Sequence, residues 1–536
     1  QFDMWVAMVG VLIGIELARR VVGNVFVIIG AIMLLYGVYG YKAPDLISHA
    51  GAPFPEMCTS IFYKSDGVFG IMANVLATYV ILFVLFGAYL EGCGAQRFFI
   101  DFPLAAVGHR IGGPAKVSVI ASGLFGSISG SAIANTVSTG TFTIPMMKKA
   151  GFKPHIAGAI EPAASIGGMF MPPVMGAGGF IMAELTGVPY SRIMLVAVFP
   201  AIMYFFSVFV MVHYEAKMHN VVGEKFHKSA IEILVKEWYY ILPLVVITVF
   251  MLLWYSPAYS AILGIITCLI ISWVRPETRM DLTMAALVLP IMAGDWFKVD
   301  HKFSVIPGVL IAAFIYWRFR KESWQGLKNF VVAARVGTEN SLKIGATVGV
   351  IGIIIGVLSF SGLVLTFADI IIELAGDAVF WGIDFRLVAT IFLIAFASLI
   401  LGMGVPVTAA YLITAVVAVP ALTHLGVNEI AAHMIVYWLS QDSNITPPVC
   451  IAAFAGATIA KANMWRTAFS SFKFAKFLYL GPFLFGYVPG FSLDGSTWDI
   501  VKAFVLITLG TYAYAWFLSG YWVKLLSRAF KRRAAA

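Results

Sequence analysis

The sequence predicts an all-α polytopic membrane protein built from two inverted repeats. Three observations predict this fold. First, 60% of the 536 residues are hydrophobic and only 12% are charged, whereas a soluble domain carries about 25% charged residues. Second, apolar runs recur along the chain, several of them near the roughly 20 residues that a membrane-spanning helix needs. Third, two distant segments repeat one another without a gap.

The repeat relates residues 127–174 to residues 402–449 at a constant offset of 275 positions. Each unit has small and polar residues, an apolar stretch, a proline, a Gly turn, a helix and a final Pro-Pro pair. The matched pairs are Pro145 and Pro420, Gly151 and Gly426, Ala157 and Ala432, Pro172 and Pro447, and Pro173 and Pro448. Because the offset is constant, we interpret the two segments as copies of one structural unit.

Each unit is predicted to contain a re-entrant helical hairpin followed by a broken helix. The hairpin segments 126–141 and 401–414 are rich in Gly, Ser, Thr and Pro, and the breaks lie in 161–174 and 440–449. Unwound backbone at membrane depth is tolerated only where it is buried or lines a cavity. Two breaks in matching positions therefore indicate a binding site between the repeats.

The distribution of basic residues predicts the orientation of the units. Lys148, Lys149 and Lys153 follow the first hairpin, whereas 387–460 contains no Lys or Arg. By the positive-inside rule the first hairpin opens to the cytoplasm and the second to the opposite side. The repeats are thus inverted, which is the symmetry that alternating access requires. The basic residues after Lys524 place the C-terminus in the cytoplasm.

Two stretches suggest packing roles. Gly345, Gly349, Gly352 and Gly356 lie on one helix face and predict close helix packing. Residues 318–343 alternate charged and apolar residues at helical spacing, which is typical of an amphipathic helix lying along the membrane interface.

Glu161 and Asp442 are acidic residues inside hydrophobic segments, and each lies beside a helix break. Such residues are costly in a membrane and are candidates for function. They either coordinate a coupling cation, relay a proton, or form structural hydrogen-bonded carboxylates.

Small polar residues and glycines surround the two breaks and could supply oxygen ligands and backbone carbonyls, or they could merely hold helices together. No Lys or Arg lies in the four broken segments, so an anionic substrate would be held by hydroxyls, amides and helix N-termini. The predicted substrate-binding residues are Ser129, Ser131, Asn135, Thr136, Thr408 and Asn444. The predicted cation-binding or proton-relay residues are Ser127, Gly130, Glu161, Ser165, Gly168, Gly402, Gly404, Asp442, Ser443 and Thr446.

Several other function classes are not supported. The chain has no GxxxxGK[ST] or HExxH motif, and GSISG at 126–130 lacks the preceding soluble strand of a hydrolase. We therefore expect no enzyme activity and no ATPase. The net charge of +9 fits the bias of an inner-membrane protein, and no nucleic-acid partner is expected. A channel with two re-entrant pore loops is the alternative to a transporter.

The segments GSISGSAIANTVSTGTFTIPMMKKAGF (126–152), EPAASIGGMFMPPVMGAGGFIMAE (161–184) and SQDSNITPPVCIAAFAGATIA (440–460) resemble the large membrane subunit of tripartite ATP-independent periplasmic (TRAP) transporters. More narrowly, the chain resembles the fused small-plus-large membrane subunit of the TAXI subclass, over about 20–490. Family members often have Ser-Thr-Gly-Gly where this chain has Ser165-Ile166-Gly167-Gly168, which puts one sodium ligand in doubt.

The resemblance implies an elevator-type transporter of the ion-transporter-superfamily kind in the bacterial inner membrane. It implies uptake of a small organic acid, such as a dicarboxylate or a glutamate-like acid, driven by sodium or protons without any cofactor. Sodium would bind at the hairpin tips and helix breaks. A TAXI-type periplasmic substrate-binding protein would be the partner, and membrane lipid would surround the chain.

The expected organisation follows from the repeat and the resemblance together. The predicted parts are 1–41 as a remnant of small-subunit-like helices, 42–214 as the first inverted repeat, 215–318 as connecting helices, 319–490 as the second inverted repeat, and 491–536 as the C-terminal helix and basic tail. On this view, residues upstream of Gln1 are expected to be missing from the numbering.

Overall fold

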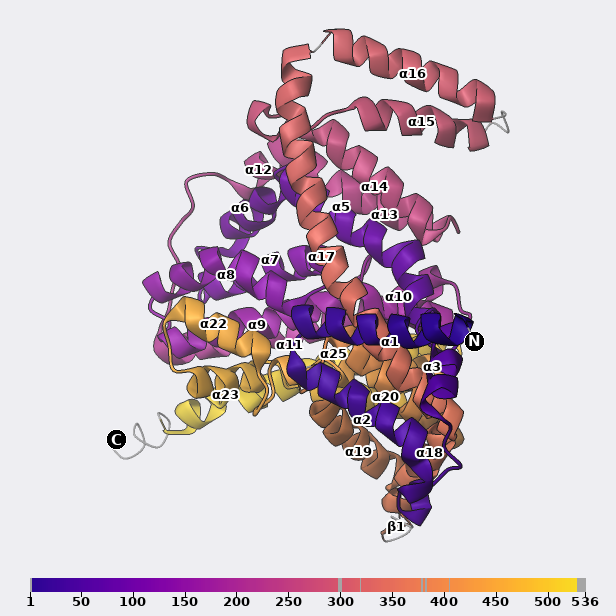
Figure 1. Cartoon of the computed structure of the whole chain (residues 1–536). Coiled ribbons are helices and arrows are strands. Elements are labelled where there is room, and N and C mark those ends of the chain that lie inside the picture. The colour runs from indigo at the N-terminus through magenta and orange to yellow at the C-terminus, as the bar shows by residue number, and fades with distance from the viewer. Residues whose placement is uncertain are drawn as a thin grey trace, which may run out of the picture. The chain divides into compact units, whose positions relative to one another are not determined.

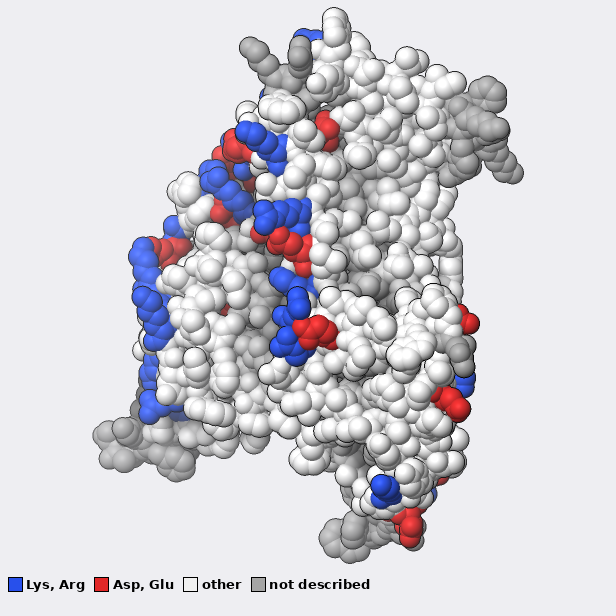
Figure 2. Space-filling model, in the orientation of Figure 1, with Lys and Arg blue, Asp and Glu red and all other residues white. Residues whose placement is uncertain are grey.

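The computed structural model describes residues 2–296, 301–318, 320–376, 379–380, 383–403 and 405–527. These residues are almost entirely helical, apart from the short antiparallel hairpin β1 (Val379–Phe380) and β2 (Ile383–Asp384). Within the described part, seven helices are long and apolar enough to cross a membrane by length and composition. Figure 2 shows broad surfaces without charged residues, as expected of a polytopic membrane protein.

The chain forms two compact units. The first comprises Gln1–Ala77, Ala106–Phe226 and Lys343–Ala536, and the second comprises Thr78–Ala105 and His227–Leu342. One long helix, α17 (Arg320–Ser361), contributes residues to both.

Before the first hairpin, the first unit contains α1 (Phe2–Val21), α2 (Asn24–Tyr39), η1 (Gly40–Lys42), η2 (Asp45–Ile47), α3 (Phe54–Tyr63) and α4 (Ile71–Val75). The first repeat continues with α7 (Gly113–Ser129), α8 (Ala132–Lys149), α9 (Pro154–Phe170), α10 (Gly176–Thr186) and α11 (Tyr190–His219). The second half holds α18 (Leu363–Ala375), α19 (Arg386–Leu401), α20 (Val407–His424), α21 (Glu429–Leu439), η6 (Asp442–Asn444), α22 (Ile451–Ala460), α23 (Met464–Phe474), α24 (Phe477–Tyr487), η7 (Pro489–Ser492) and α25 (Thr497–Ser519).

The second unit contains α5 (Ile81–Gly92), α6 (Ala95–Val107), α12 (Ala230–Glu237), η4 (Trp238–Ile241), α13 (Leu242–Leu252), α14 (Pro257–Ser272), η5 (Pro276–Thr278), α15 (Thr283–Trp296) and α16 (His301–Arg318). The π-helical turn η3 (Leu76–Val80) leads into α5. In this unit α13 packs on α14, α14 on α5, and α15 lies beside α16 (Figure 1).

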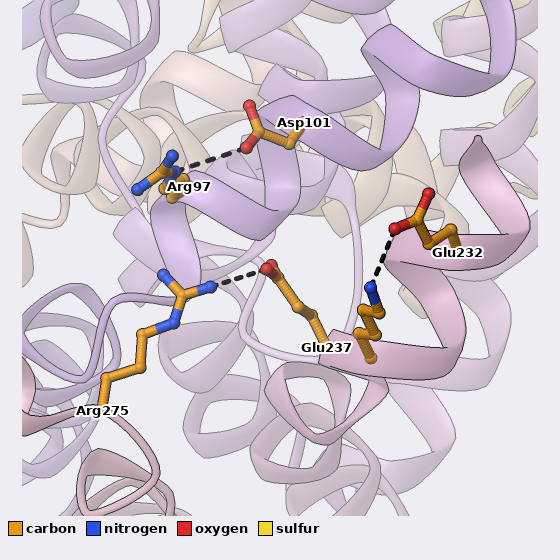
Figure 3. A network of polar contacts seen from close by, with 6 residues as sticks. Arg97, Asp101, Glu232, Glu237 and Arg275 are labelled. Atoms are coloured by element: carbon orange, nitrogen blue, oxygen red, sulfur yellow. Dashed lines mark hydrogen bonds and ion pairs between the residues drawn. The ribbon is translucent and has the colours of Figure 1, made fainter. Parts of the chain in front are cut away.

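The second unit contains several local ion pairs. Arg275 Nη2 lies 2.6 Å from Glu237 Oε1, and Arg97 and Asp101 pair within α6 at 3.4 Å (Figure 3). Glu232 accepts from Lys236 one turn further along α12 at 2.8 Å. Pairs of this kind satisfy charges at the ends of apolar helices.

The helix boundaries reproduce the sequence repeat. The hairpin helices α8 and α20 begin at Ala132 and Val407, and the helices after the breaks, α10 and α22, begin at Gly176 and Ile451. Both pairs differ by the same 275 positions that relate the two sequences. The predicted repeat is therefore a repeat of structure, while the opposite orientation of its copies in a membrane stays a prediction.

Local chemistry explains where the first hairpin turns. Gly130 adopts a left-handed conformation with φ of 61°, which ends α7 at no steric cost. Ser131 then caps α8, because its hydroxyl accepts the Ala134 N–H at 3.3 Å. Pro172 and Pro173 lack the N–H groups that would continue α9, and Pro447 and Pro448 likewise prevent helix from continuing after η6; both Pro-Pro bonds are cis.

The two repeats interlock within the first unit. The helix after the second break, α22, packs on α8 and α9, and the helix after the first break, α10, packs on α20 and α21. The approach of α9 to α22 is close, because a Cβ on Gly456 would lie 2.2 Å from the Gly158 carbonyl oxygen. Lys148 Nζ also donates to the Ala460 carbonyl at 2.7 Å. Each break is thus packed against the other copy of the repeat.

The glycine stripe of α17 confirms the prediction of close helix packing. A Cβ on Gly349 would lie 2.8 Å from Gly14 Cα, and one on Gly352 would lie 2.4 Å from Val68 Cα. Within the stretch 318–343, which the sequence predicts as an amphipathic interfacial helix, the residues from Arg320 on are continuous with the apolar run that follows: all 42 residues from Arg320 to Ser361 form α17.

Candidate functional site

Glu161 is the best-satisfied buried charge in the first repeat. Its side chain is completely buried in α9. Ser118 and Thr143 lie within hydrogen-bonding contact of Oε2, and Ser122 and Thr139 lie within hydrogen-bonding contact of Oε1. A carboxylate accepts about four hydrogen bonds, so these hydroxyls fill both of its oxygens.

The four hydroxyls come from both helices of the first hairpin. Ser118 and Ser122 are one turn apart on α7, and Thr139 and Thr143 are one turn apart on α8. Side chains four residues apart share a helix face, so each helix presents two hydroxyls to Glu161. The carboxylate therefore fastens both helices of the hairpin to α9, which favours the structural role among the predicted alternatives for Glu161.

The tip of this hairpin lies at its own break. A Cβ on Gly130 would lie 3.2 Å from Gly176 Cα at the start of α10, and one on Gly168 would lie 2.4 Å from Gly126 Cα. Asn135 is fully buried, and its side-chain amide donates to the Ser122 carbonyl at 3.0 Å. Backbone and side-chain oxygens of α7 and α9 are thus close together, as the glycines predict.

The remaining predicted residues of the first hairpin occupy varied positions. Ser127 is buried and donates to the Leu124 carbonyl at 2.8 Å, whereas Ser129 and Ser131 are partly exposed at the tip. The buried hydroxyls of Thr136 and Ser165 have no hydrogen-bond partner among the described residues. Those two hydroxyls are the free polar atoms of this predicted site.

Two tyrosines cover the carbonyl oxygens of the first break. Tyr190 OH lies 2.8 Å from the Pro173 carbonyl and 2.6 Å from the Val174 carbonyl. Tyr437 OH donates to the Met169 carbonyl at 2.8 Å and also contacts the Met175 carbonyl. Sequence reasoning predicted unwound carbonyls here but missed the tyrosines that bond to them.

The second break differs from the first, because buried polar atoms beside it lack hydrogen-bond partners among the described residues. Asp442, Ser443 and Asn444 form the short helix η6 between α21 and Pro447, and all three are buried. The hairpin tip lies against it, because a Cβ on Gly402 would lie 2.7 Å from Ser443 Oγ. Predicted residues from the hairpin and the break therefore meet here; Gly404 lies outside the described residues.

Several buried polar atoms at and beside η6 lack partners within the described residues. Within the described part of the chain, Asp442 Oδ1 and both side-chain amide atoms of Gln441 are buried without a hydrogen bond. The hydroxyls of Ser398 and Thr390, on the helix α19 that packs against η6, are also unpartnered there. Buried polar atoms without partners are rare and costly, so this group is the candidate for a ligand site in the second repeat.

The other predicted residues of the second repeat have varied surroundings. Asn444 donates from its side-chain amide to the Gln441 carbonyl at 3.2 Å. Thr446 shares a hydrogen bond with Tyr479 OH, and Thr408 is partly exposed near the start of α20. Gln441 and Ser398 were not predicted from the sequence, although Gln441 stands beside Asp442 in the quoted segment SQDSNITPPV.

The oxygen-bearing side chains at and beside η6 are of the kinds that hard cations take as ligands. Sodium, like other hard cations, takes carboxylate, amide and hydroxyl oxygens, and Asp442, Gln441 and Ser398 offer one of each. Among the described residues no three His, Cys, Asp or Glu side chains gather as a transition-metal site would require.

The comparison with protein families agrees with this arrangement. Residues 9–491 match the family model described as "Tripartite ATP-independent periplasmic transporter, DctM component". The chain belongs to this family. Its homologues are TRAP transporter permeases and not enzymes, as the sequence predicts.

Individual permeases are similar over shorter stretches. A putative TRAP transporter large permease protein of Haemophilus influenzae is 26% identical over 35% of this chain and 45% of its own length. The C4-dicarboxylate TRAP transporter large permease protein DctM of Vibrio cholerae is 26% identical over 34% of this chain and 38% of its own length. The sialic acid permease SiaM of the same species is 31% identical over 22% of this chain and 27% of its own length. The chain thus spans less than half the length of the curated relatives it matches.

Among solved structures, the Alcanivorax borkumensis YdaH transporter aligns over 92% of this chain and 99% of its own, with 16% identity and a TM-score of 0.47. That similarity is too low to assign a common fold.

Proposed function

We propose that this TRAP-family permease takes up a small organic anion by cation-coupled secondary active transport. A periplasmic substrate-binding protein delivers the anion, and an elevator movement of the hairpins and broken helices carries it across the membrane. The fused membrane subunit of the TAXI subclass is the proposed type, on the motifs at 126–152, 161–184 and 440–460. The relatives that carry a named solute, such as C4-dicarboxylates and sialic acid, support a carboxylate as substrate.

The observation that carries this proposal is the pair of interlocked hairpin-and-break units. Each hairpin tip touches its own break, at Gly130 with Gly176 and at Gly402 with Ser443. Each helix after a break packs on the other repeat. Such paired discontinuities are where secondary transporters hold substrate and coupling ion.

The coupling ion is proposed to bind at η6. Asp442 supplies the charge and Gln441, Ser398 and Ser443 supply neutral oxygens. Sodium would bind all of these oxygens at once, whereas a proton would bind Asp442 alone. Because Glu161 already holds four hydroxyls, it is proposed as a structural carboxylate.

Uptake into proteoliposomes tests the proposal. Labelled carboxylates, supplied with the cognate binding protein, are expected to accumulate under an imposed sodium or proton gradient, and the gradient that drives uptake identifies the ion. Uptake that is equally fast without any binding protein would argue against the tripartite assignment.

The channel with two re-entrant pore loops is separated by counterflow. A transporter preloaded with unlabelled substrate concentrates labelled substrate transiently inside the vesicle. A channel only equilibrates the label, so absence of the overshoot would overturn secondary active transport.

A further inference from the structure

Tyr437 belongs to the second repeat, but its hydroxyl forms hydrogen bonds with backbone carbonyls of the first repeat. It lies on α21 and is 2% exposed. The hydroxyl donates to the Met169 carbonyl at 2.8 Å and contacts the Met175 carbonyl. These carbonyls flank the Pro172–Pro173 break: Met169 is in the last turn of α9, and Met175 caps α10. A single side chain therefore bridges the two halves of the first broken helix.

The ring of Tyr437 is held tightly in this place. A Cβ on Gly178 would lie 2.2 Å from ring atom Cε2, and the Phe170 ring meets it edge-on at 5.9 Å between centroids. The void beside the ring, lined in part by Tyr437, Met175 and Met434, has no room for a water molecule. Removing the hydroxyl takes away the donor that the Met169 and Met175 carbonyls share.

The opposite side of the ring contacts the second hairpin. Tyr411 on α20 packs against Tyr437 in a T-shaped contact, with ring centroids 5.2 Å apart and planes at 70°. Tyr411 is itself fixed by a 3.0 Å hydrogen bond between its hydroxyl and His433 Nδ1 on α21. A continuous series of contacts thus runs from the second hairpin through Tyr411 and Tyr437 to the first break.

We propose that Tyr437 is a positioning residue that couples the second hairpin to the first helix break. A shift of α20 displaces Tyr411 and with it the Tyr437 ring, and the hydroxyl then leaves the carbonyls that it holds across the break. The two repeats are coupled because one buried side chain belongs to one repeat and stabilises the discontinuity of the other. This inference goes beyond the proposed function, and its test requires no substrate, ion or partner.

Hydrogen exchange of the full chain in detergent or nanodiscs tests the coupling. Tyr437→Phe keeps the ring and removes only the hydroxyl, so amide exchange in 169–179 is expected to rise about tenfold. The matched control is Tyr204→Phe, since Tyr204 is equally buried and donates to the Ala163 carbonyl at 2.7 Å, inside α9 and away from the break. That control is expected to leave exchange in 169–179 unchanged. Unchanged exchange there in Tyr437→Phe, or an equal rise in both variants, overturns the proposal.

A double-mutant cycle tests whether the second hairpin takes part. Tyr411→Leu removes the ring contact and is expected to raise exchange in 169–179 about threefold, although Tyr411 touches neither carbonyl. In the Tyr437→Phe background the same change should add little, because the link is already broken. Full additivity of the two changes, or no effect of Tyr411→Leu on 169–179, contradicts the coupling.

Gly178→Ala gives an independent measurement if Tyr437→Phe does not fold. Alanine raises the helix propensity of α10, so on local grounds exchange in 169–179 should fall. The added methyl group would displace the Tyr437 ring, so the proposal predicts that amide exchange in 169–179 rises instead. A fall overturns the proposal.

Discussion

Glu161 and Asp442 are both buried carboxylates, yet their surroundings are opposite. Glu161 lies in the middle of α9 and not beside a helix break as the sequence suggested, whereas Asp442 lies in η6 before the second break. Four hydroxyls from α7 and α8 surround Glu161, whereas Asp442 Oδ1 and the side-chain amide of Gln441 have no partners among the residues that the structure describes. A saturated carboxylate stabilises the fold, while an unsatisfied one costs stability until a ligand arrives. The difference teaches that the two copies of the repeat can carry different roles: the satisfied carboxylate suits a structural role, and the unsatisfied one is where we propose that the coupling ion binds.

The largest expected effect concerns stability at Glu161. Glu161→Gln keeps the shape of the side chain, but its amide nitrogen cannot accept, so two of the four hydroxyls lose their acceptor. We expect the free energy of unfolding to fall by about 3 kcal/mol. Thermal or denaturant unfolding in detergent measures this, with Asp442→Asn as the matched carboxylate-to-amide control. An equal loss in both variants would remove the distinction between the two sites.

Asp442→Asn is expected to impair uptake while leaving stability nearly unchanged or increased. Stability should stay within about 1 kcal/mol of wild type or increase, since an unpaired buried charge is removed. Uptake driven by the cation gradient should fall by about 100-fold, because the coupling charge is lost. Vesicle uptake at matched protein levels checks this, and retained gradient-driven uptake would refute the assignment of the ion to η6.

Single hydroxyls around Glu161 should each matter moderately. Ser118→Ala and Ser122→Ala each remove one donor to the carboxylate, and each is expected to lower the free energy of unfolding by about 1 kcal/mol. Ser129→Ala, at the partly exposed hairpin tip, serves as the control and should cost almost nothing. If all three serines behave alike in unfolding experiments, the hydroxyls do not stabilise Glu161.

Ser398→Ala should have the smallest effect and act on function alone. The Ser398 hydroxyl has no partner in the described part of the chain, so its removal should leave stability within about 0.5 kcal/mol of wild type. The cation concentration for half-maximal uptake should rise about threefold if this hydroxyl is a ligand. A lowered melting temperature with unchanged cation dependence would make Ser398 structural.

Much of this architecture could be predicted from sequence because it depends on local and repeated signals. Pro172 and Pro447 mark the breaks, the constant offset of 275 marks equivalent helices, and apolar runs mark a polytopic chain. The site was less predictable, because its partners come from different helices. Glu161 was identified, but the four hydroxyls around it lie 18 to 43 residues away. Two Ser and two Thr at four-residue spacing were the signal that could have found them.

The asymmetry between the sites could not be predicted from the repeat. Glu161 aligns with Val436, and Asp442 aligns with Gly167, so each carboxylate is unique to its copy. Whether a carboxylate is satisfied depends on three-dimensional packing, such as the contact of Gly402 with Ser443. Tyr437, which covers carbonyls of the first break, was missed for the same reason, since it belongs to the other repeat.

Ion-dependent unfolding tests the central claim most directly. Melting of wild type, Glu161→Gln and Asp442→Asn is followed while sodium replaces choline at fixed pH, and again while pH falls at fixed sodium. A ligand at 100 times its Kd adds about 2.7 kcal/mol of stability. The account predicts that sodium or protons stabilise wild type and Glu161→Gln but not Asp442→Asn. Stabilisation that persists in Asp442→Asn and disappears in Glu161→Gln would contradict it.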